Sequence, residues 1–112
     1  LTLLWQDQVG GLDVLNNDGE WVTAHPIEGT IVVNVGDLLM RWTNNAFKST
    51  QHRVVNRKEV ERYSMLVAWD PDYETVVDPT LVCQYGEKVL YPPVRCGDYV
   101  LTRFDSSFSY RQ

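Results

Sequence analysis

The sequence predicts a mainly β protein: a double-stranded β-helix of the jelly-roll or cupin-like kind, incomplete, with a short helix near residues 38–44 and a C-terminal helix. Three observations favour this class: many short strand-like segments, turn residues between them, and no internal repeat. At 112 residues the chain is long enough for one domain at most, which would span residues 1–112. Its apolar fraction of 44% and charged fraction of 22% are typical of a folded globular protein.

The first third of the chain is predicted to consist of strands separated by turns. Residues 1–7 resemble a strand, and Gly10 and Gly11 mark the turn before the next one. Residues 16–19, Asn-Asn-Asp-Gly, predict a tight hairpin because these residue types accept positive φ. Residues 30–35 form the most continuous β-branched run, which predicts a strand buried on both faces.

The remainder is predicted to hold two helices and several short extended pieces. Asp37 can cap a short helix, and residues 62–69 read as a strand that Pro71 ends. Residues 75–79 form a short extended piece. Between residues 98 and 110, four apolar residues recur at helical spacing: Val100, Leu101, Phe104 and Phe108.

The central part of the chain, residues 49–64, carries the most distinctive side chains. Strand alternation places two sets of residues each on one face: His52, Val54 and Asn56, and then Arg62, Ser64, Leu66, Ala68 and Asp70. An imidazole, a guanidinium and a hydroxyl can therefore point into a common interior. Charged groups are rarely buried without a partner, which favours a negatively charged ligand. Two alternatives remain open: a core histidine at His52, and a surface salt bridge from Arg62 to Glu59 or Glu61.

The pattern S-T-x-H-R-V-x-N at residues 49–56, followed by R-x-S at residues 62–64, resembles a known enzyme family. The family is that of the iron(II)/2-oxoglutarate-dependent dioxygenases, in its isopenicillin-N-synthase-like branch. Further segments fit the same family in the same order, so the resemblance covers essentially the whole chain: residues 1–7, 10–14, 33–39 and 91–94. The family fold is the same double-stranded β-helix.

The resemblance implies a role for each residue of the central constellation. His52 would be the distal Fe(II) ligand, while Arg62 and Ser64 would hold the distal carboxylate of the cosubstrate 2-oxoglutarate. Val54 would form an apolar wall beside the cosubstrate, and Ala68 and Asp70 would lie toward a small-molecule substrate. The implied reaction couples oxidative decarboxylation of 2-oxoglutarate to hydroxylation or oxidation of that substrate.

The sequence departs from the family pattern at the metal. The family holds iron with a His-x-Asp pair plus the distal histidine, and that pair precedes the segment equivalent to residues 1–7. His25 is followed by Pro26 and Ile27, so it offers no substitute. We therefore expect the C-terminal portion of a dioxygenase domain, inactive alone, with an exposed sheet edge that favours association. Two alternative functions remain open: a non-catalytic jelly-roll binding module without iron, and a metal enzyme in which another chain supplies some of the metal ligands.

Composition argues against several other classes of protein. A formal net charge of −5 argues against nucleic acid as a partner, and no apolar run reaches the roughly 18–20 residues that cross a membrane. The first residues lack the pattern of a secretory signal. Cys83 and Cys96 lie thirteen residues apart with no metal-binding spacing, which favours two reduced thiols in a cytoplasmic protein over a disulfide or a metal site.

Overall fold

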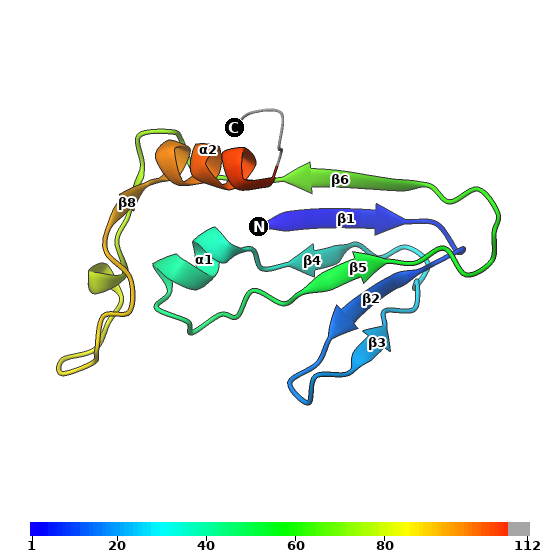
Figure 1. Ribbon diagram of the computed structural model, residues 1–112, viewed down its shortest axis with the longest axis horizontal. Coiled ribbons are helices and arrows are strands. Elements are labelled where there is room, and N and C mark those ends of the chain that lie inside the picture. The colour runs from blue at the N-terminus through cyan, green and yellow to red at the C-terminus, as the bar shows by residue number, and fades with distance from the viewer. Residues whose placement is uncertain (108–112) are drawn as a thin grey trace. The chain divides into compact units, whose positions relative to one another are not determined.

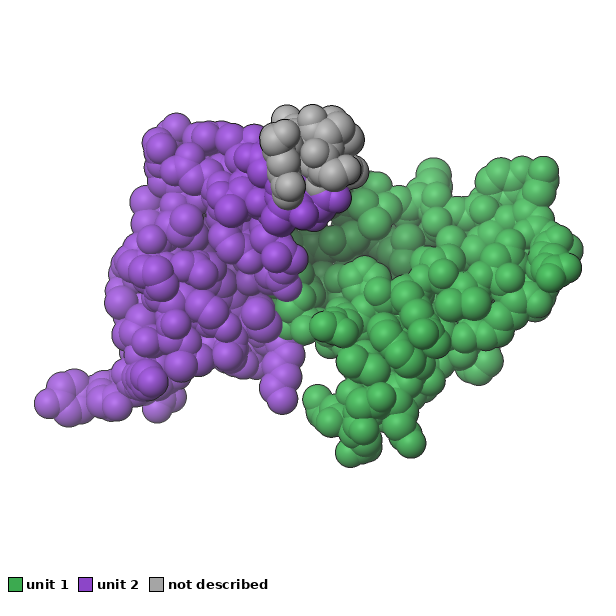
Figure 2. Space-filling model, in the orientation of Figure 1, with its two compact units in different colours: residues 1–36, 49–69 green, residues 37–48, 70–112 purple. Residues whose placement is uncertain are grey.

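The computed structural model describes residues 1–107, in which the chain forms two compact units (Figures 1 and 2). The first unit contains Leu1–Gly36 and Ser49–Trp69, and the second contains Asp37–Lys48 and the chain from Asp70 onward. Within residues 1–107, no helix is both long and apolar enough to cross a membrane.

The first unit consists of two three-stranded antiparallel sheets. One has the order β4-β1-β6, with the bounds Val32–Asn34, Thr2–Gln6 and Ser64–Ala68. The other has the order β3-β2-β5, with the bounds Trp21–Thr23, Leu12–Leu15 and His52–Val54. The chain thus passes repeatedly from one sheet to the other, as in a jelly roll.

Two segments carry the chain from one sheet to the other at the same end of the unit, on the right of Figure 1. They are residues 7–11, between β1 and β2, and residues 55–63, between β5 and β6. Backbone hydrogen bonds tie them together: Asp7 N to Tyr63 O at 3.1 Å and Val55 N to Gly11 O at 2.8 Å. Gly11 has a φ of +96°, and a Cβ there would lie 2.6 Å from Val55 O, so the approach requires glycine.

The predicted hairpin at residues 16–19 is confirmed between β2 and β3. The side-chain Oδ1 of Asn16 accepts hydrogen bonds from the backbone N–H groups of Asp18 and Glu20, both at 2.9 Å. Gly19 takes a φ of +79°. The Asn side chain therefore closes the turn that the sequence predicted.

The prediction of a strand buried on both faces at residues 30–35 is wrong. The strand β4 is shorter and lies at a sheet edge, where Val33 is 60% exposed and Ile31 is 56% exposed. The residues of β6, at the opposite edge, are all exposed, including Met65 and Leu66. A β-branched run indicates a strand but does not indicate whether neighbouring chain covers it.

The second unit holds both predicted helices. Its elements are α1 Asp37–Trp42, β7 Val76–Val77, the 3₁₀ helix η1 Pro79–Leu81, β8 Val94–Arg95 and α2 Cys96–Ser107. The strands β7 and β8 pair in an antiparallel ribbon. Predicted helical residues 108–110, including Phe108, lie outside the described residues. Cys83 and Cys96 are free thiols, as expected from their spacing.

The interior of the second unit combines apolar and polar anchors. Val77 and Cys96 are buried, and Gly97 packs so closely on the Tyr73 ring that any side chain there would collide with it. Arg41 lies over the Tyr91 and Tyr99 rings, 5.0 and 5.6 Å from their centroids.

Candidate cosubstrate and metal site

Arg62 lies in the first unit, just before β6, and its guanidinium is held by three neutral acceptors. Nε donates to Gly10 O at 2.5 Å, Nη1 to Ser64 Oγ at 3.1 Å and Nη2 to Gln6 Oε1 at 3.4 Å. None of the ion pairs found within residues 1–107 includes Arg62. The half-buried guanidinium is therefore oriented without being neutralised, which suits the binding of a carboxylate.

The alternative of a salt bridge between Arg62 and the nearby loop carboxylates is wrong. Glu61 instead accepts a hydrogen bond from the Tyr63 hydroxyl at 2.8 Å, which raises the pKa of that tyrosine. Glu59 forms no ion pair with any described residue.

Ser64 lies two residues after Arg62 in the chain, and the strand register places Gln6 beside Ser64. Gln6 of β1 and Ser64 of β6 are direct cross-strand partners, so their side chains lie on the same face of the sheet. Ser64, Leu66 and Ala68 share that face by alternation, as predicted. Sequence reasoning missed Gln6, although alternation along residues 2–6 would have shown a polar residue on the face of Leu4.

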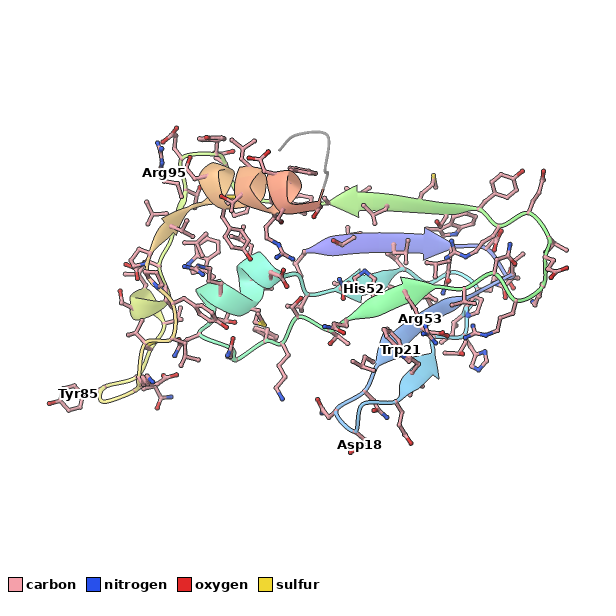
Figure 3. All side chains as sticks on the ribbon, viewed as in Figure 1. Asp18, Trp21, His52, Arg53, Tyr85 and Arg95 are labelled. Atoms are coloured by element: carbon pink, nitrogen blue, oxygen red, sulfur yellow. The ribbon has the colours of Figure 1, made fainter. Side chains whose placement is uncertain are left out.

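His52 and Val54 lie on one face of β5, where they pair with Val14 and Leu12 of β2. Leu12 is 3% exposed, whereas His52 and Val54 are exposed, so His52 is not a core histidine. Figure 3 shows the His52 ring on the side of β5 toward β4, and Arg53 on the other side, near Trp21.

The hydrogen bond of His52 leaves one ring nitrogen available. Nδ1 lies 3.1 Å from the backbone oxygen of Thr50. When Nδ1 carries the proton and donates it to this oxygen, Nε2 presents a lone pair, which is how a second partner orients a metal-binding imidazole. The residue thus fits a metal ligand.

The predicted site residues come from different elements of the fold. His52 begins β5, while Arg62 lies just before β6, which belongs to the other sheet. Ala68 ends β6 opposite Thr2, while Asp70 lies beyond the strand and belongs to the second unit. Across the described range, no group of three His, Cys, Asp or Glu side chains could hold a metal ion.

A second charged cluster, missed by sequence reasoning, lies on the opposite face of the β3-β2-β5 sheet. The buried carboxylate of Asp13 accepts hydrogen bonds from Arg57 Nη2 at 2.6 Å, Arg53 Nε at 3.2 Å and Thr23 Oγ1 at 3.0 Å. The bond from Arg57, against the opposing effect of burial, lowers the pKa of Asp13 to about 2. This cluster anchors the loop after β5, which leads to Arg62.

The fold and the arginine site together define a jelly-roll protein whose first unit presents an oriented guanidinium with no ion-pair partner among the described residues. The sequence matches the family described as the 2OG-Fe(II) oxygenase superfamily over residues 1–71, so the chain belongs to that superfamily. The resemblance stated from the motifs is confirmed.

Individual relatives agree with this assignment. The 2-oxoglutarate-Fe(II) type oxidoreductase ppzC of Metarhizium rileyi is 44% identical over 96% of this chain, which spans 29% of that protein. A full-length Neurospora crassa protein, crystallised with alpha-KG, is 36% identical with a TM-score of 0.83, over 96% of this chain and 34% of its own. JOX2, crystallised with 2OG, Fe and JA, is 31% identical with a TM-score of 0.81, over 90% of this chain and 30% of its own. The chain thus spans about a third of these relatives.

Proposed function

We propose that this chain is part of an oxygenase that uses Fe(II) and 2-oxoglutarate to hydroxylate or oxidise a small organic molecule. The observation that carries the proposal is the Arg62 guanidinium, fixed by Gly10 and Ser64 and lacking a carboxylate partner among the described residues. A guanidinium can bind a carboxylate through two parallel charge-assisted hydrogen bonds, and the Ser64 hydroxyl can add a third.

The residues of the proposed site have separate tasks in the reaction. Arg62 and Ser64 orient 2-oxoglutarate by its distal carboxylate, and Val54 provides an apolar wall that limits water. His52 supplies one imidazole through Nε2, held in position by the Thr50 carbonyl oxygen. The iron, when bound, supplies the oxygen chemistry that couples loss of carbon dioxide from 2-oxoglutarate to oxidation of the substrate.

One imidazole is insufficient to hold Fe(II), which in this class of site takes two histidines and one carboxylate. We propose that a His-x-Asp pair outside this chain supplies the other two ligands. The coding sequence upstream of Leu1 tests this directly, because an in-frame His-x-Asp should be found there. If none is found, the binding module without iron or ligands from another chain become the better explanations.

The substrate is proposed only as a class. The Neurospora crassa protein has been crystallised with thymine and JOX2 with JA. By analogy, we propose that the substrate here is also a small organic molecule. Ala68 and Asp70 are proposed to lie beside it, with Ala68 leaving room and Asp70 accepting a hydrogen bond. If Asp70→Asn leaves the preference among substrates unchanged in the full-length protein, this role for Asp70 is refuted.

The principal test is turnover by the full-length protein. We expect succinate to form from 2-oxoglutarate in the presence of Fe(II) and oxygen, and His52→Ala to abolish it. Lys48→Ala, a substitution in the second unit, provides a control that should not abolish turnover. Succinate production that is unchanged in His52→Ala would refute the ligand role.

Two further expectations remain proposals. We propose a cytoplasmic location, supported by the two free thiols and testable by cell fractionation.

We also propose that the 112-residue chain made alone associates through the outer edge of β6, whose residues are all exposed. Sedimentation that shows a monomer at every concentration would refute that association.

A further inference from the structure

We infer that Gln6 is a positioning residue that orients the Arg62 guanidinium while leaving its charge for a ligand. Through this role, Gln6 would select cosubstrates that carry a distal carboxylate. The inference rests on the proposed function, because it concerns the same guanidinium, and it assigns a task to a residue outside the R-x-S pattern.

The amide of Gln6 is held between two polar partners, so its orientation is defined. Gln6 is only 8% exposed. Its Nε2 donates to Ala24 O at 3.4 Å, and its Oε1 accepts from Arg62 Nη2, also at 3.4 Å. A carbonyl oxygen cannot donate, so the Ala24 side requires the NH₂ group, and the oxygen is left for the guanidinium.

The strand register explains why Gln6 and Ser64 act on the same group. The two residues are cross-strand partners in β1 and β6, and both side chains contact Arg62. Together with Gly10 O they provide acceptors of three chemical kinds: an amide, a hydroxyl and a peptide carbonyl. All three are neutral, and a guanidinium oriented by neutral groups keeps its full charge for a bound carboxylate.

A glutamate at position 6 would have nearly the same shape but the opposite effect. Its carboxylate would pair with Arg62 and compete with any incoming carboxylate for the same charge. It would also place a second oxygen against Ala24 O, where Gln6 now places a donor. The neutrality of Gln6, rather than its size, is therefore the property that we assign to ligand selection.

The test compares two keto acids in the full-length protein by titration calorimetry, with Mn²⁺ in place of Fe(II). 2-Oxoglutarate and 2-oxopentanoate have the same five-carbon chain, but 2-oxopentanoate lacks the distal carboxylate. We expect Gln6→Glu to weaken 2-oxoglutarate binding by about tenfold or more, equivalent to about 1.4 kcal/mol. Binding of 2-oxopentanoate should change by less than about twofold, because it does not use the Arg62 charge.

Two matched variants separate charge from packing. Gln8→Glu adds the same charge two residues away on an exposed side chain and should leave both affinities unchanged. Gln6→Met keeps the length and the neutrality of the side chain but removes the acceptor for Arg62 Nη2, so 2-oxoglutarate binding should weaken by less than in Gln6→Glu, while 2-oxopentanoate binding should change by less than about twofold. This variant keeps the inference testable even if Gln6→Glu fails to fold, which thermal unfolding would reveal.

Several outcomes would overturn the inference. Equal loss of both keto acids in Gln6→Glu would show a packing defect, and no loss of 2-oxoglutarate would show that Gln6 does not control the charge. A loss of 2-oxoglutarate affinity in Gln6→Met as large as that in Gln6→Glu would show that neutrality is not the determining property, and an unchanged 2-oxoglutarate affinity in Gln6→Met would show that Gln6 does not orient Arg62. If the wild-type protein binds 2-oxoglutarate but any of these contradicting outcomes is observed in the variants, the proposed function stands and only the inference about Gln6 fails. If the wild-type protein does not bind 2-oxoglutarate, both fail.

Discussion

The first unit holds arginines in two contrasting environments. Arg53 and Arg57 share the buried carboxylate of Asp13, with Arg57 at 2.6 Å. Arg62, five residues after Arg57, has only neutral acceptors among the described residues. The same residue type thus serves to hold the fold in one place and remains available to a ligand in the other.

The difference shows that the surrounding acceptors, rather than the arginine itself, determine the role. A guanidinium that shares a buried carboxylate has less attraction left for a further anion, since part of its charge is compensated. A guanidinium oriented by a carbonyl, a hydroxyl and an amide retains that attraction. Substitutions in the two environments should therefore have different effects, on stability around Asp13 and on ligand affinity at Arg62.

The largest effect on stability is expected from Asp13→Asn. The asparagine keeps an acceptor for Thr23 but removes the charge that two arginines share, and loss of one partner from a buried ion pair is strongly destabilising. Urea unfolding at pH 7 should show a clear loss of unfolding free energy. Asp18→Asn, at an exposed turn position, is the matched control and should show little change. Equal effects of the two substitutions would contradict a structural role for Asp13.

The same cluster predicts the response to acid. Because the pKa of Asp13 falls from 3.8 to about 2 on folding, the folded state binds its proton less readily than the unfolded chain. Its contribution to stability is therefore complete above about pH 4 and is lost as the pH falls toward 2. The difference in stability between wild type and Asp13→Asn should shrink over this range. A difference that stays constant from pH 5 to pH 2 would contradict the lowered pKa.

The next largest effect is expected where the two crossing segments meet. Gly11→Ala would combine positive φ with a Cβ 2.6 Å from Val55 O, and we expect a loss of about 3 kcal/mol. Gly19→Ala has similar positive φ but open space, and should cost about 1 kcal/mol. Chemical denaturation of both variants gives the difference in their unfolding free energies. That difference measures the cost of the close approach between Gly11 and Val55 O, apart from the cost of positive φ. Equal losses would show that this approach is not tight in solution.

A smaller and more specific effect is expected on cosubstrate affinity. Arg62→Lys removes the bidentate geometry and should weaken 2-oxoglutarate binding by about 1–3 kcal/mol. Arg53→Lys, in the cluster that already has its carboxylate, should leave that affinity nearly unchanged. Titration calorimetry of the full-length variants with 2-oxoglutarate measures both affinities and so compares the two arginine environments. Similar losses in both variants would contradict the distinction between them.

Local pattern was sufficient to predict much of the fold. Period-two alternation placed Ser64 and Ala68 on one face and His52 with Val54 on another, and both placements are confirmed by the register. The turn at residues 16–19 followed from residues that accept positive φ. These features depend on a few neighbouring residues, so one sequence contains the information for them.

Long-range partners could not be predicted in the same way. Arg57 meets Asp13 across 44 positions of sequence, and Arg62 meets Gln6 across 56. Both contacts depend on which strands pair and in which register, which alternation alone does not specify. The same limit explains why the predicted burial of residues 30–35 was wrong. Whether β4 is buried depends on which other segments cover it, and not on its own β-branched residues.

The smallest expected effect concerns Trp21, whose ring centroid lies 4.2 Å from the Arg53 guanidinium carbon. Trp21 is 39% exposed, and its ring covers the charged cluster on the exposed side. A double-mutant cycle with Trp21→Leu and Arg53→Gln should give a coupling of about 0.5–1 kcal/mol in unfolding free energy. Zero coupling would mean that Asp13 alone holds Arg53. A measurable coupling would show that the Trp21 ring and the Asp13 carboxylate together hold Arg53, whereas Arg62 has only neutral hydrogen-bond acceptors among the described residues.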